Sequence, residues 1–308
     1  MKKMSTIILG GDTKAIRSFK IYAEDIYPPV SIFNMVLRNI SFSLKLSTKY
    51  WMTDIQNVVR GHSLIIVFDY PNMVEICREV EEKADKGSRL VLYLWNPMLI
   101  YSADVIKQIS SRWEIWTFDP KDAQTHGFKY AGQFLYDNYL PDYKDAEFDS
   151  DLFFIGINKG RFKFLRELEY KCLKDYNIRP HFIYVDKFRG ILSKSYSGWV
   201  SYKDMLLMAA KSKAILELNQ SEQAGLTLRA LEALLMKKKL VTNNNQIKHY
   251  KFAKHANVYI LNNDMDSLAE FLNQPMINVE LVDISQYRFK SWLERIEKGV
   301  ELDDYIEN

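Results

Sequence analysis

The sequence predicts an α/β protein built from two doubly wound domains. Its 308 residues suffice for two domains that each bury a core of their own. Short apolar strands alternate with helical segments along the whole chain, a pattern typical of βαβ units and parallel sheets. Residues 140–151 are acidic and lack apolar periodicity, so we interpret them as the linker between the domains.

The first domain is predicted over residues 1–145. Its strands appear as short apolar runs, and its helices as apolar residues spaced three or four positions apart. The predicted strands are 5–9, 63–68, 90–94 and 114–117, and the predicted helices are 74–86 and 103–110. This order of elements predicts a parallel sheet with helices on its faces.

The second domain is predicted over residues 150–285 as a second Rossmann-like unit. Ser201 and Asp204 have the spacing of a capping box at the start of a helix. The predicted strands are 152–155, 181–185, 214–218, 240–242 and 257–261. The predicted helices are 164–176, 205–211 and one that opens at 225–227. Another helix is expected over 287–298, within a C-terminal segment that spans residues 286–308.

The composition excludes several classes of protein. An apolar share of 47% and a charged share of 26% are ordinary for a globular chain. A net charge of +3, with no recognisable nucleic-acid motif, predicts no nucleic-acid partner. The two cysteines, Cys77 and Cys172, are far apart and are expected to be reduced thiols. No apolar stretch has the length of a signal peptide or a membrane span, so a cytoplasmic protein is expected.

The most informative stretch is residues 213–245, where a strand leads through a polar loop into a helix. Such loops bind anionic ligands in α/β proteins, because unpaired backbone N–H groups and the helix dipole face them. Gly225, Arg229 and Glu232 fall at helical positions that share one stripe. The pattern predicts a ligand site. The alternative is that Arg229 and Glu232 form an ordinary exposed ion pair.

The string from Gln223 to Ala233 has the pattern Q-x-G-x-T-x-R-x-x-E-A, and a K-K-L-x-T strand follows from Lys238. This stretch resembles the C-terminal half of bacterial GT-B glycosyltransferases that build lipopolysaccharide or capsule. The resemblance implies two Rossmann-like domains facing a cleft, with the acceptor on the first and a nucleotide sugar on the second. It also implies a C-terminal helix that returns to the first domain. Ala230 stands where retaining members of the group carry a second glutamate, so no stereochemical outcome is assigned.

The resemblance also implies which residues bind the donor. Glu232 would bind the ribose, together with other residues of the loop, the helix and the preceding capping box. The implied donor-binding set is Gly156, Lys159, Arg161, Tyr202, Gln223, Gly225, Thr227, Arg229 and Glu232. The donor is expected to be UDP-linked, and neither a cofactor nor a bound metal is expected.

The turn from Gly156 to Arg161 is the second chemical candidate. Its two glycines let the backbone approach a ligand, and Arg161 can hold a phosphate through two donors. It is not a P-loop, because no Ser or Thr follows Lys159 at the required place. Its position matches that of the basic residue with which GT-B enzymes hold the donor diphosphate. The alternative is a surface turn with two solvated cations.

The candidates for the catalytic base lie in the first domain. Asp12 follows Gly10 and Gly11 at the end of the first strand, where it could take a proton or cap the next helix. His126 lies in a predicted polar loop and is the second candidate, with a solvated histidine as the alternative. Asp119 and Asp122 lie close to His126, but their spacing fits no recognised metal site.

These observations lead to a glycosyltransferase that moves a sugar from a nucleotide sugar to a glycan or lipid-linked glycan acceptor. The alternative from another class is a non-catalytic partner subunit that keeps the fold. An oxidoreductase is disfavoured, because no G-x-G-x-x-G follows the first strand. Residues 29–49 mix apolar and basic side chains and are interpreted as a core helix. The alternative is a helix that lies on the inner face of the membrane.

Overall fold

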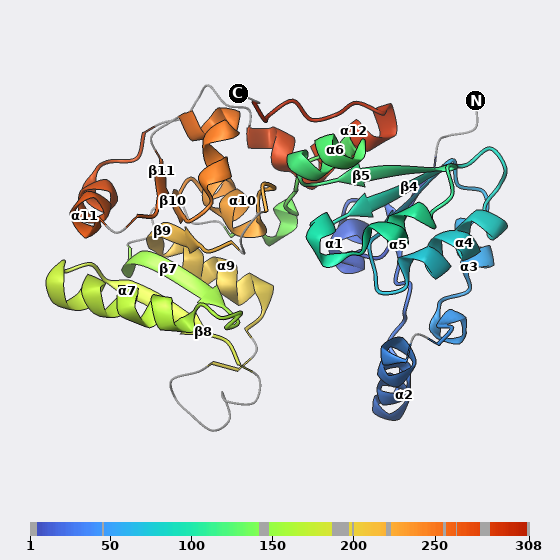
Figure 1. Ribbon diagram of the computed structural model, residues 1–308, viewed down its shortest axis with the longest axis horizontal. Helices are drawn as coiled ribbons and strands as arrows, with labels where there is room; N and C mark the ends of the chain where they lie inside the picture. The colour runs from blue at the N-terminus through green and yellow to red at the C-terminus, as the bar shows by residue number, and fades with distance from the viewer. Residues whose placement is uncertain are drawn as a thin grey trace. The chain divides into compact units, whose positions relative to one another are not determined.

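The computed structural model describes residues 5–44, 46–141, 148–186, 197–198, 200–219, 223–254, 257–262, 264–277 and 284–306 (Figure 1). The chain divides into two compact units. Unit 1 comprises Met1–Gly132 with Leu293–Leu302, and unit 2 comprises Gln133–Trp292 with Asp303–Asn308. The first division therefore falls directly after Gly132, ahead of the linker that the sequence predicts.

Unit 1 is built on a six-stranded parallel sheet with the order β2-β1-β3-β4-β5-β6. Its strands are β1 (Thr6–Leu9), β2 (Tyr22–Glu24), β3 (Leu64–Phe68), β4 (Arg89–Leu94), β5 (Trp113–Thr117) and β6 (Lys129–Tyr130). The four predicted strands are all present, with Ile66 of β3 opposite Val91 of β4. The prediction missed β2 and β6, because strands of three and two residues are too short to show periodicity.

Helices connect the strands of this sheet. They are α1 (Thr13–Ser18), α2 (Ile32–Ser43), α3 (Ile55–Val59), α4 (Met73–Lys83), α5 (Ala103–Lys107) and α6 (Pro120–His126), with short 3-10 helices at Lys49–Trp51 and Met98–Ile100. The predicted spacing of α4 is confirmed, since Ile76, Cys77 and Val80 pack in one cluster with alternate residues of β3 and β4. The apolar stripe of α4 therefore covers part of the sheet.

Unit 2 has a five-stranded parallel sheet with the order β11-β10-β9-β7-β8. Its strands are β7 (Ser150–Gly156), β8 (Pro180–Tyr184), β9 (Ser212–Glu217), β10 (Lys239–Thr242) and β11 (Val258–Ile260). Its helices are α7 (Phe162–Asp175), α9 (Tyr202–Ala210), α10 (Leu228–Leu235), α11 (Met265–Asn273) and the first part of α12 (Phe289–Lys298). Ser150 and Asp151 begin β7, so the predicted linker is wrong at its end, and its residues 142–147 lie outside the described residues.

Both sheets follow the same winding. Numbered along the chain within each unit, the first five strands lie in the order 2-1-3-4-5. The direction of winding reverses between the first and third strands, which are β1 and β3 in unit 1 and β7 and β9 in unit 2. In doubly wound sheets, ligands bind outside the carboxyl ends of the strands at this switch point. The fold therefore offers one such position in each unit.

Part of the C-terminal segment belongs to unit 1. Residues Leu293–Leu302, which include the last turns of α12, cluster with the first unit. Thr6 donates to the Glu297 carboxylate at 2.7 Å, and the backbone N–H of Leu302 donates to the Tyr130 carbonyl at 2.9 Å. These contacts tie the C-terminal segment to strands at both sides of the unit 1 sheet.

The interpretation of residues 29–49 as a core helix is wrong. The segment forms α2, and none of the residues of α2 is buried. Within the described residues, no helix combines the length and the apolar character needed to cross a bilayer. Large apolar side chains of α2, such as Ile32 and Phe33, are exposed to solvent.

A prediction for stability arises at Glu114 of β5, whose side chain is 28% exposed. Hydrogen bonds from Arg89, together with one from Lys129, lower the pKa of Glu114 from 4.5 to about 2. A depressed folded-state pKa adds stability above the unfolded value, and this stability is lost as the pH falls from 4.5 towards about 2. Glu114→Gln is therefore expected to lower the free energy of unfolding by about 2–3 kcal/mol near neutral pH.

Urea unfolding of both proteins checks this expectation. The difference between wild type and Glu114→Gln should shrink to less than half near pH ~3, because the wild-type carboxylate is then losing its contribution. A difference that stays constant with pH would mean that packing, and not the ionised carboxylate, accounts for the effect.

Candidate functional site

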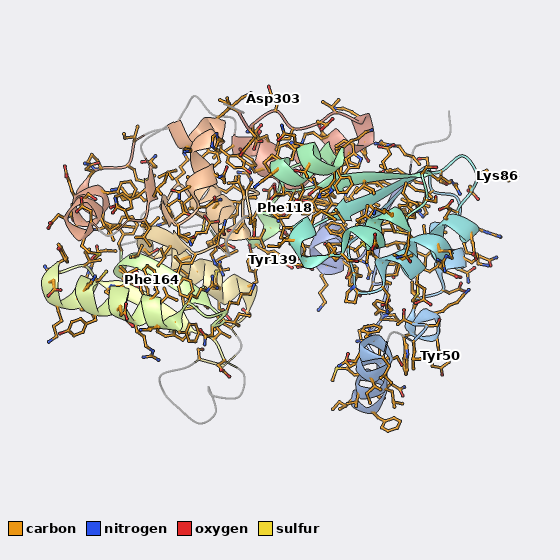
Figure 2. The ribbon with its side chains drawn as sticks, in the orientation of Figure 1. Tyr50, Lys86, Phe118, Tyr139, Phe164 and Asp303 are labelled. Atoms are coloured by element: carbon orange, nitrogen blue, oxygen red, sulfur yellow. The ribbon has the colours of Figure 1, made fainter. Side chains whose placement is uncertain are left out.

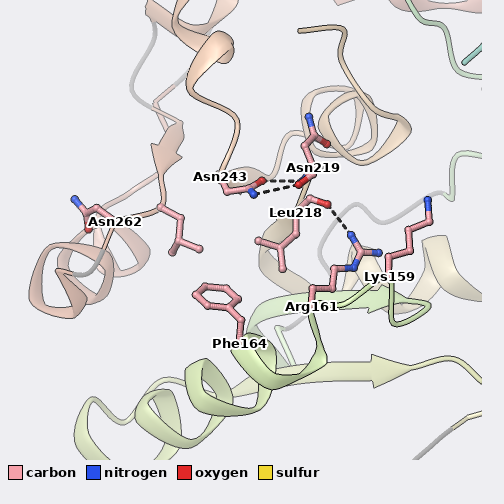
Figure 3. Close-up of a pocket in the computed structure, with 8 residues that line it drawn as sticks. Lys159, Arg161, Phe164, Leu218, Asn219, Asn243 and Asn262 are labelled. Atoms are coloured by element: carbon pink, nitrogen blue, oxygen red, sulfur yellow. Dashed lines mark hydrogen bonds between the residues drawn. The ribbon is translucent and has the colours of Figure 1, made fainter. Parts of the chain in front are cut away.

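A cavity of about 520 Å³ opens at the switch point of unit 2 (Figure 3). Its lining residues follow the carboxyl ends of β7, β9, β10 and β11. They are Lys159, Arg161, Phe164, Leu218, Asn219, Asn243, Leu261 and Asn262. The structure thus brings Lys159 and Arg161 to the place where this winding binds ligands.

Arg161 joins the two sides of the switch point. Its Nη1 donates to the carbonyl of Leu218 at 2.6 Å, and its guanidinium lies 5.0 Å from the centre of the Phe154 ring. Gly156 leaves room for this side chain, since a Cβ there would stand 2.7 Å from Nη2 of Arg161. Arg161 is therefore held by its neighbours, as a binding residue with a fixed geometry has to be.

The charge of Arg161 is not balanced by a carboxylate among the described residues. Burial lowers the pKa of Arg161, and the positive charge of Arg229 lowers it further. Its Nε is buried and finds no hydrogen-bond partner within the described parts of the chain. A half-buried cation with an unused donor favours an anionic ligand.

The turn that carries Lys159 also begins helix α7. Lys159 has a φ of +43° and Gly160 a φ of +80°, so two consecutive residues are left-handed. Asn158 then accepts a hydrogen bond from the backbone N–H of Phe162 at 3.2 Å. The first turn of α7 has no acidic residue. The positive end of the helix dipole therefore adds to the two cations beside the cavity.

Two asparagines form the opposite rim. The backbone N–H of Asn219 donates to Oδ1 of Asn243 at 2.7 Å, and Nδ2 of Asn243 donates to the carbonyl of Asn219 at 3.2 Å (Figure 3). This pair fastens the end of β9 to the end of β10. Both side-chain polar atoms of Asn219 are buried and have no hydrogen-bond partner in the described chain.

Three predicted donor residues form a separate buried cluster. Glu232 is fully buried and accepts hydrogen bonds from Arg229 and, at 2.9 Å, from the hydroxyl of Tyr202. Burial raises the pKa of Glu232, whereas the charge of Arg229 acts to lower it. The alternative of an exposed ion pair is wrong, because the carboxylate has no contact with solvent. None of the three lines the cavity, so the ribose-binding role of Glu232 stays a prediction.

The loop before α10 contains the remaining predicted donor residues. Thr227 caps α10 and accepts from the N–H of Arg229 at 3.1 Å, while Gln223 donates to the carbonyl of Gly225 at 3.0 Å. The predicted opening of the helix at 225–227 is wrong by a few residues, because the cap at Thr227 delays the first turn to Leu228. Gly225 therefore lies outside the stripe that the sequence assigned to it.

Glu217, at the end of β9, was not among the candidates. It is 1% exposed and accepts hydrogen bonds from Thr227 and, at 2.5 Å, from Thr242. Burial raises the pKa of Glu217. Its carboxylate connects β9, β10 and the N-terminus of α10, so it holds the loop in place. The sequence signal for Glu217 is a single carboxylate in an apolar strand, β9.

The two predicted base candidates of unit 1 are not brought together. Asp12 caps α1 and accepts from the N–H of Ala15 at 3.1 Å. His126 lies in the last turn of α6, stacked on Phe128, so the predicted polar loop is wrong. Asp12 follows β1 and His126 follows β5, with β3 and β4 between them. A catalytic role for either residue stays a prediction.

The acidic residues next to His126 have structural partners. Asp119 caps α6 and accepts from the N–H of Lys121 at 2.9 Å, whereas Asp122 accepts from the N–H of Met98 at 2.7 Å. Over the described chain, no group of three or more histidine, cysteine, aspartate or glutamate side chains has the arrangement of a metal site.

The asparagines of the cavity, which the sequence analysis missed, share one property. Asn219, Asn243 and Asn262 each follow the end of a strand of unit 2 closely. Asparagine is common in ordinary turns, so its position after a strand is a weak signal by itself. The rule that parallel strands present ligand residues at their carboxyl ends would have found all three.

Comparison with known proteins concerns the fold. No protein-family model and no curated protein sequence matches the chain. UDP-GlcNAc 2-epimerase of Methanocaldococcus jannaschii, solved with UDP-GlcNAc and UDP, is similar with a TM-score of 0.50 at 14% identity, over 96% of this chain and 99% of that one. Both chains have two Rossmann-like domains of the GT-B type.

Two transferases were also found. The lipopolysaccharide outer core galactosyltransferase WaaB, in its apo form, has a TM-score of 0.48 at 12% identity, over 96% of this chain and 99% of that one. The spinosyn forosaminyltransferase SpnP has a TM-score of 0.42 at 10% identity, over 96% and 90%.

Proposed function

We propose that the chain is a glycosyltransferase that moves a sugar from a nucleotide sugar to a cell-surface glycan of the lipopolysaccharide or capsule type. The observation that carries this proposal is the cationic cavity at the switch point of unit 2, with Arg161 unbalanced by any described carboxylate. Its volume of about 520 Å³ is in the range of small-molecule sites. The sequence pattern from Gln223 to Ala233 supports the same reading.

The chemistry of the proposal follows from the charges. A sugar that leaves its nucleotide builds negative charge on the diphosphate, and cations with a helix N-terminus stabilise that charge. Lys159, Arg161 and the start of α7 supply this set at one end of the cavity. We propose that these groups stabilise the leaving diphosphate without a bound metal ion. The turnover rate should therefore be unchanged when a metal chelator is added.

Glu232 and its partners have a supporting role in this proposal. The hydroxyl of Tyr202 and the guanidinium of Arg229 hold the carboxylate in one orientation. Binding of the ribose by Glu232 would require one of its oxygens to exchange a protein partner for the ribose hydroxyl. Arg229 is 27% exposed, so it can turn away from Glu232 towards solvent.

We place the acceptor in unit 1. A cavity of about 560 Å³ lies there beside the end of β3, with Glu75, Arg78, Tyr101 and Gln108 among its lining residues. A mixture of hydroxyl, amide and charged groups with apolar side chains suits a glycan, which presents hydroxyls and apolar ring faces. Asp12 and His126 remain the proposed bases.

The test is a thermal-shift comparison of UDP, GDP, CMP and dTDP, with uridine as the control without phosphate. A ligand at about 100 times its Kd stabilises the native state by about 2.7 kcal/mol, and UDP is expected to give the largest shift of the four. A shift with uridine equal to that with UDP, or no shift with any nucleotide, would contradict the proposal.

A second function is favoured by one observation. Asp12 caps α1, and His126 lies in the last turn of α6. Neither residue is among those that line the unit 1 cavity. A non-catalytic subunit of the same fold would bind the nucleotide and leave it intact. Release of UDP from UDP-sugars by the purified chain separates the two functions, since only the enzyme hydrolyses its donor slowly in the absence of acceptor.

A further inference from the structure

Helix α7 begins with two phenylalanines, and only one of them belongs to the core of unit 2. Phe162 is 6% exposed and packs edge-on against Tyr184, with ring centres 4.7 Å apart. Phe164, which is labelled in Figure 2, is 42% exposed and lies outside the core cluster that contains Phe162. It makes no contact with another aromatic ring over the described residues. A single exposed phenylalanine is ordinary, so its role depends on what its ring faces.

The ring of Phe164 faces the cavity at the switch point of unit 2. Leu218, directly after β9, and Leu261, directly after β11, line the same cavity. In Figure 3 the Phe164 ring points from α7 into the space below Leu218. One part of the cavity wall is therefore apolar, and it contains an exposed aromatic ring.

The cationic part of the cavity adjoins this apolar part. Arg161 and Phe164 stand three positions apart at the start of α7, so their Cβ atoms lie about 5–6 Å apart on one face of the helix. Lys159, in the same turn as Arg161, lines the cavity as well. A ligand that uses both parts combines anionic groups with a flat apolar ring, as a nucleoside diphosphate does.

We infer that Phe164 is the residue on which the nucleobase of the donor stacks. Every base has a π-face, and an aromatic side chain binds that face without a hydrogen-bond partner. The phosphates of the nucleotide then extend towards Arg161 and Lys159. This inference rests on the proposed function, because it places the base of the same nucleotide in the same cavity.

The sugar of the donor fits this part of the cavity less well than the base. A hexose is surrounded by hydroxyl groups, and each of them needs a hydrogen-bond partner when it leaves water. The amide oxygens of two rim residues are already engaged. Oδ1 of Asn243 accepts from the N–H of Asn219 at 2.7 Å, and Oδ1 of Asn262 accepts from the hydroxyl of Tyr259 at 2.8 Å. The face of a base, by contrast, leaves no polar group unpaired against Phe164.

The test is calorimetry of the full chain with UDP, UDP-glucose and uridine. Phe164→Leu keeps an apolar side chain but removes the flat ring, so it should weaken the binding of all three ligands about 10-fold. Phe164→Tyr keeps the ring and should bind them within about threefold of wild type. A loss shared by UDP and uridine separates Phe164 from Arg161, because the two ligands have the base in common and differ in the phosphates.

The matched control is Tyr170→Leu. It removes a ring that is 62% exposed on the same helix and lies outside the cavity. This variant should bind all three ligands as wild type does. The unfolding temperatures of the variants should match that of wild type, because the replaced side chains are exposed.

Four results would overturn the inference while leaving the proposed function in place. They are wild-type affinity for UDP in Phe164→Leu, equal losses in Phe164→Leu and Phe164→Tyr, equal losses in Phe164→Leu and the control, and a loss confined to UDP-glucose. The last result would place the donor sugar on Phe164. Failure of the wild-type chain to bind any of the three ligands would contradict the proposed function, and the inference with it.

Discussion

Replacement of Glu232 by alanine is expected to lower the free energy of unfolding by about 3–5 kcal/mol, because it breaks a buried pair by removing one partner. Glu232 is fully buried, with Arg229 and the hydroxyl of Tyr202 as its partners. Alanine leaves a cavity and removes the carboxylate that pairs with the partly buried guanidinium of Arg229. Urea unfolding, followed by circular dichroism, measures the loss directly.

A matched control uses another ion pair with the same spacing. Asp104 and Lys107 also stand three residues apart on a helix, but their side chains are 82% and 74% exposed. Asp104→Ala should therefore change stability by less than about 0.5 kcal/mol. If Glu232→Ala lowered the free energy of unfolding as little as the control, the carboxylate would not hold α9 to α10. The hydrogen bond from Tyr202 to Glu232 would then contribute little to stability.

The same site also allows stability and binding to be separated. Glu232→Gln keeps the volume and can still accept from Tyr202, so it should remain folded at ordinary temperature. If Glu232 binds the donor ribose, this variant should weaken nucleotide binding by about 1–3 kcal/mol, the range of a lost charge-assisted hydrogen bond. Unchanged affinity in calorimetry would remove the ribose role and leave Glu232 as a structural residue.

The elements that sequence reasoning found are those with enough residues to show a pattern. The strand at β9 and the helix at α7 follow directly from apolar runs and helical spacing. The edge strand β2 and helix α1 were missed, because three and six residues contain less than two periods of any pattern. Helix α11 was missed although its nine residues bury Leu268 and Leu272.

The site residues that could be predicted depend on local sequence, whereas those that could not depend on residues far away in the chain. The position of Lys159 and Arg161 at a ligand site could be predicted, because a glycine-containing turn with basic residues after a strand is visible in the local sequence. The burial of Glu232 depends on Tyr202, which is 30 positions away and belongs to another helix. Whether α2 is buried likewise depends on what packs against it. The spacing of residues along α2 does not reveal that Arg38 and Phe42 face Tyr27.

Replacement of Arg161 by alanine is expected to weaken UDP binding about 100-fold and uridine binding less than threefold, since only UDP has the phosphate that a guanidinium can hold through two donors. Arg161→Lys keeps the charge but cannot hold the Leu218 carbonyl and a phosphate with one planar group, so a smaller defect should remain. Lys159→Ala should lower the turnover rate as well as the affinity, because charge on the leaving group grows in the transition state.

Calorimetry with UDP and with uridine on each variant makes the comparison. Lys174→Ala is the matched control, because it removes an exposed cation from the last turn of α7 while the cavity lies at the first. Both ligands should bind this control as they bind wild type. Equal losses for UDP and uridine in the Arg161 variants would show that the arginine shapes the turn through Phe154 and Leu218 and does not contact phosphate. A loss confined to UDP would place the diphosphate beside Arg161, at the switch point of unit 2.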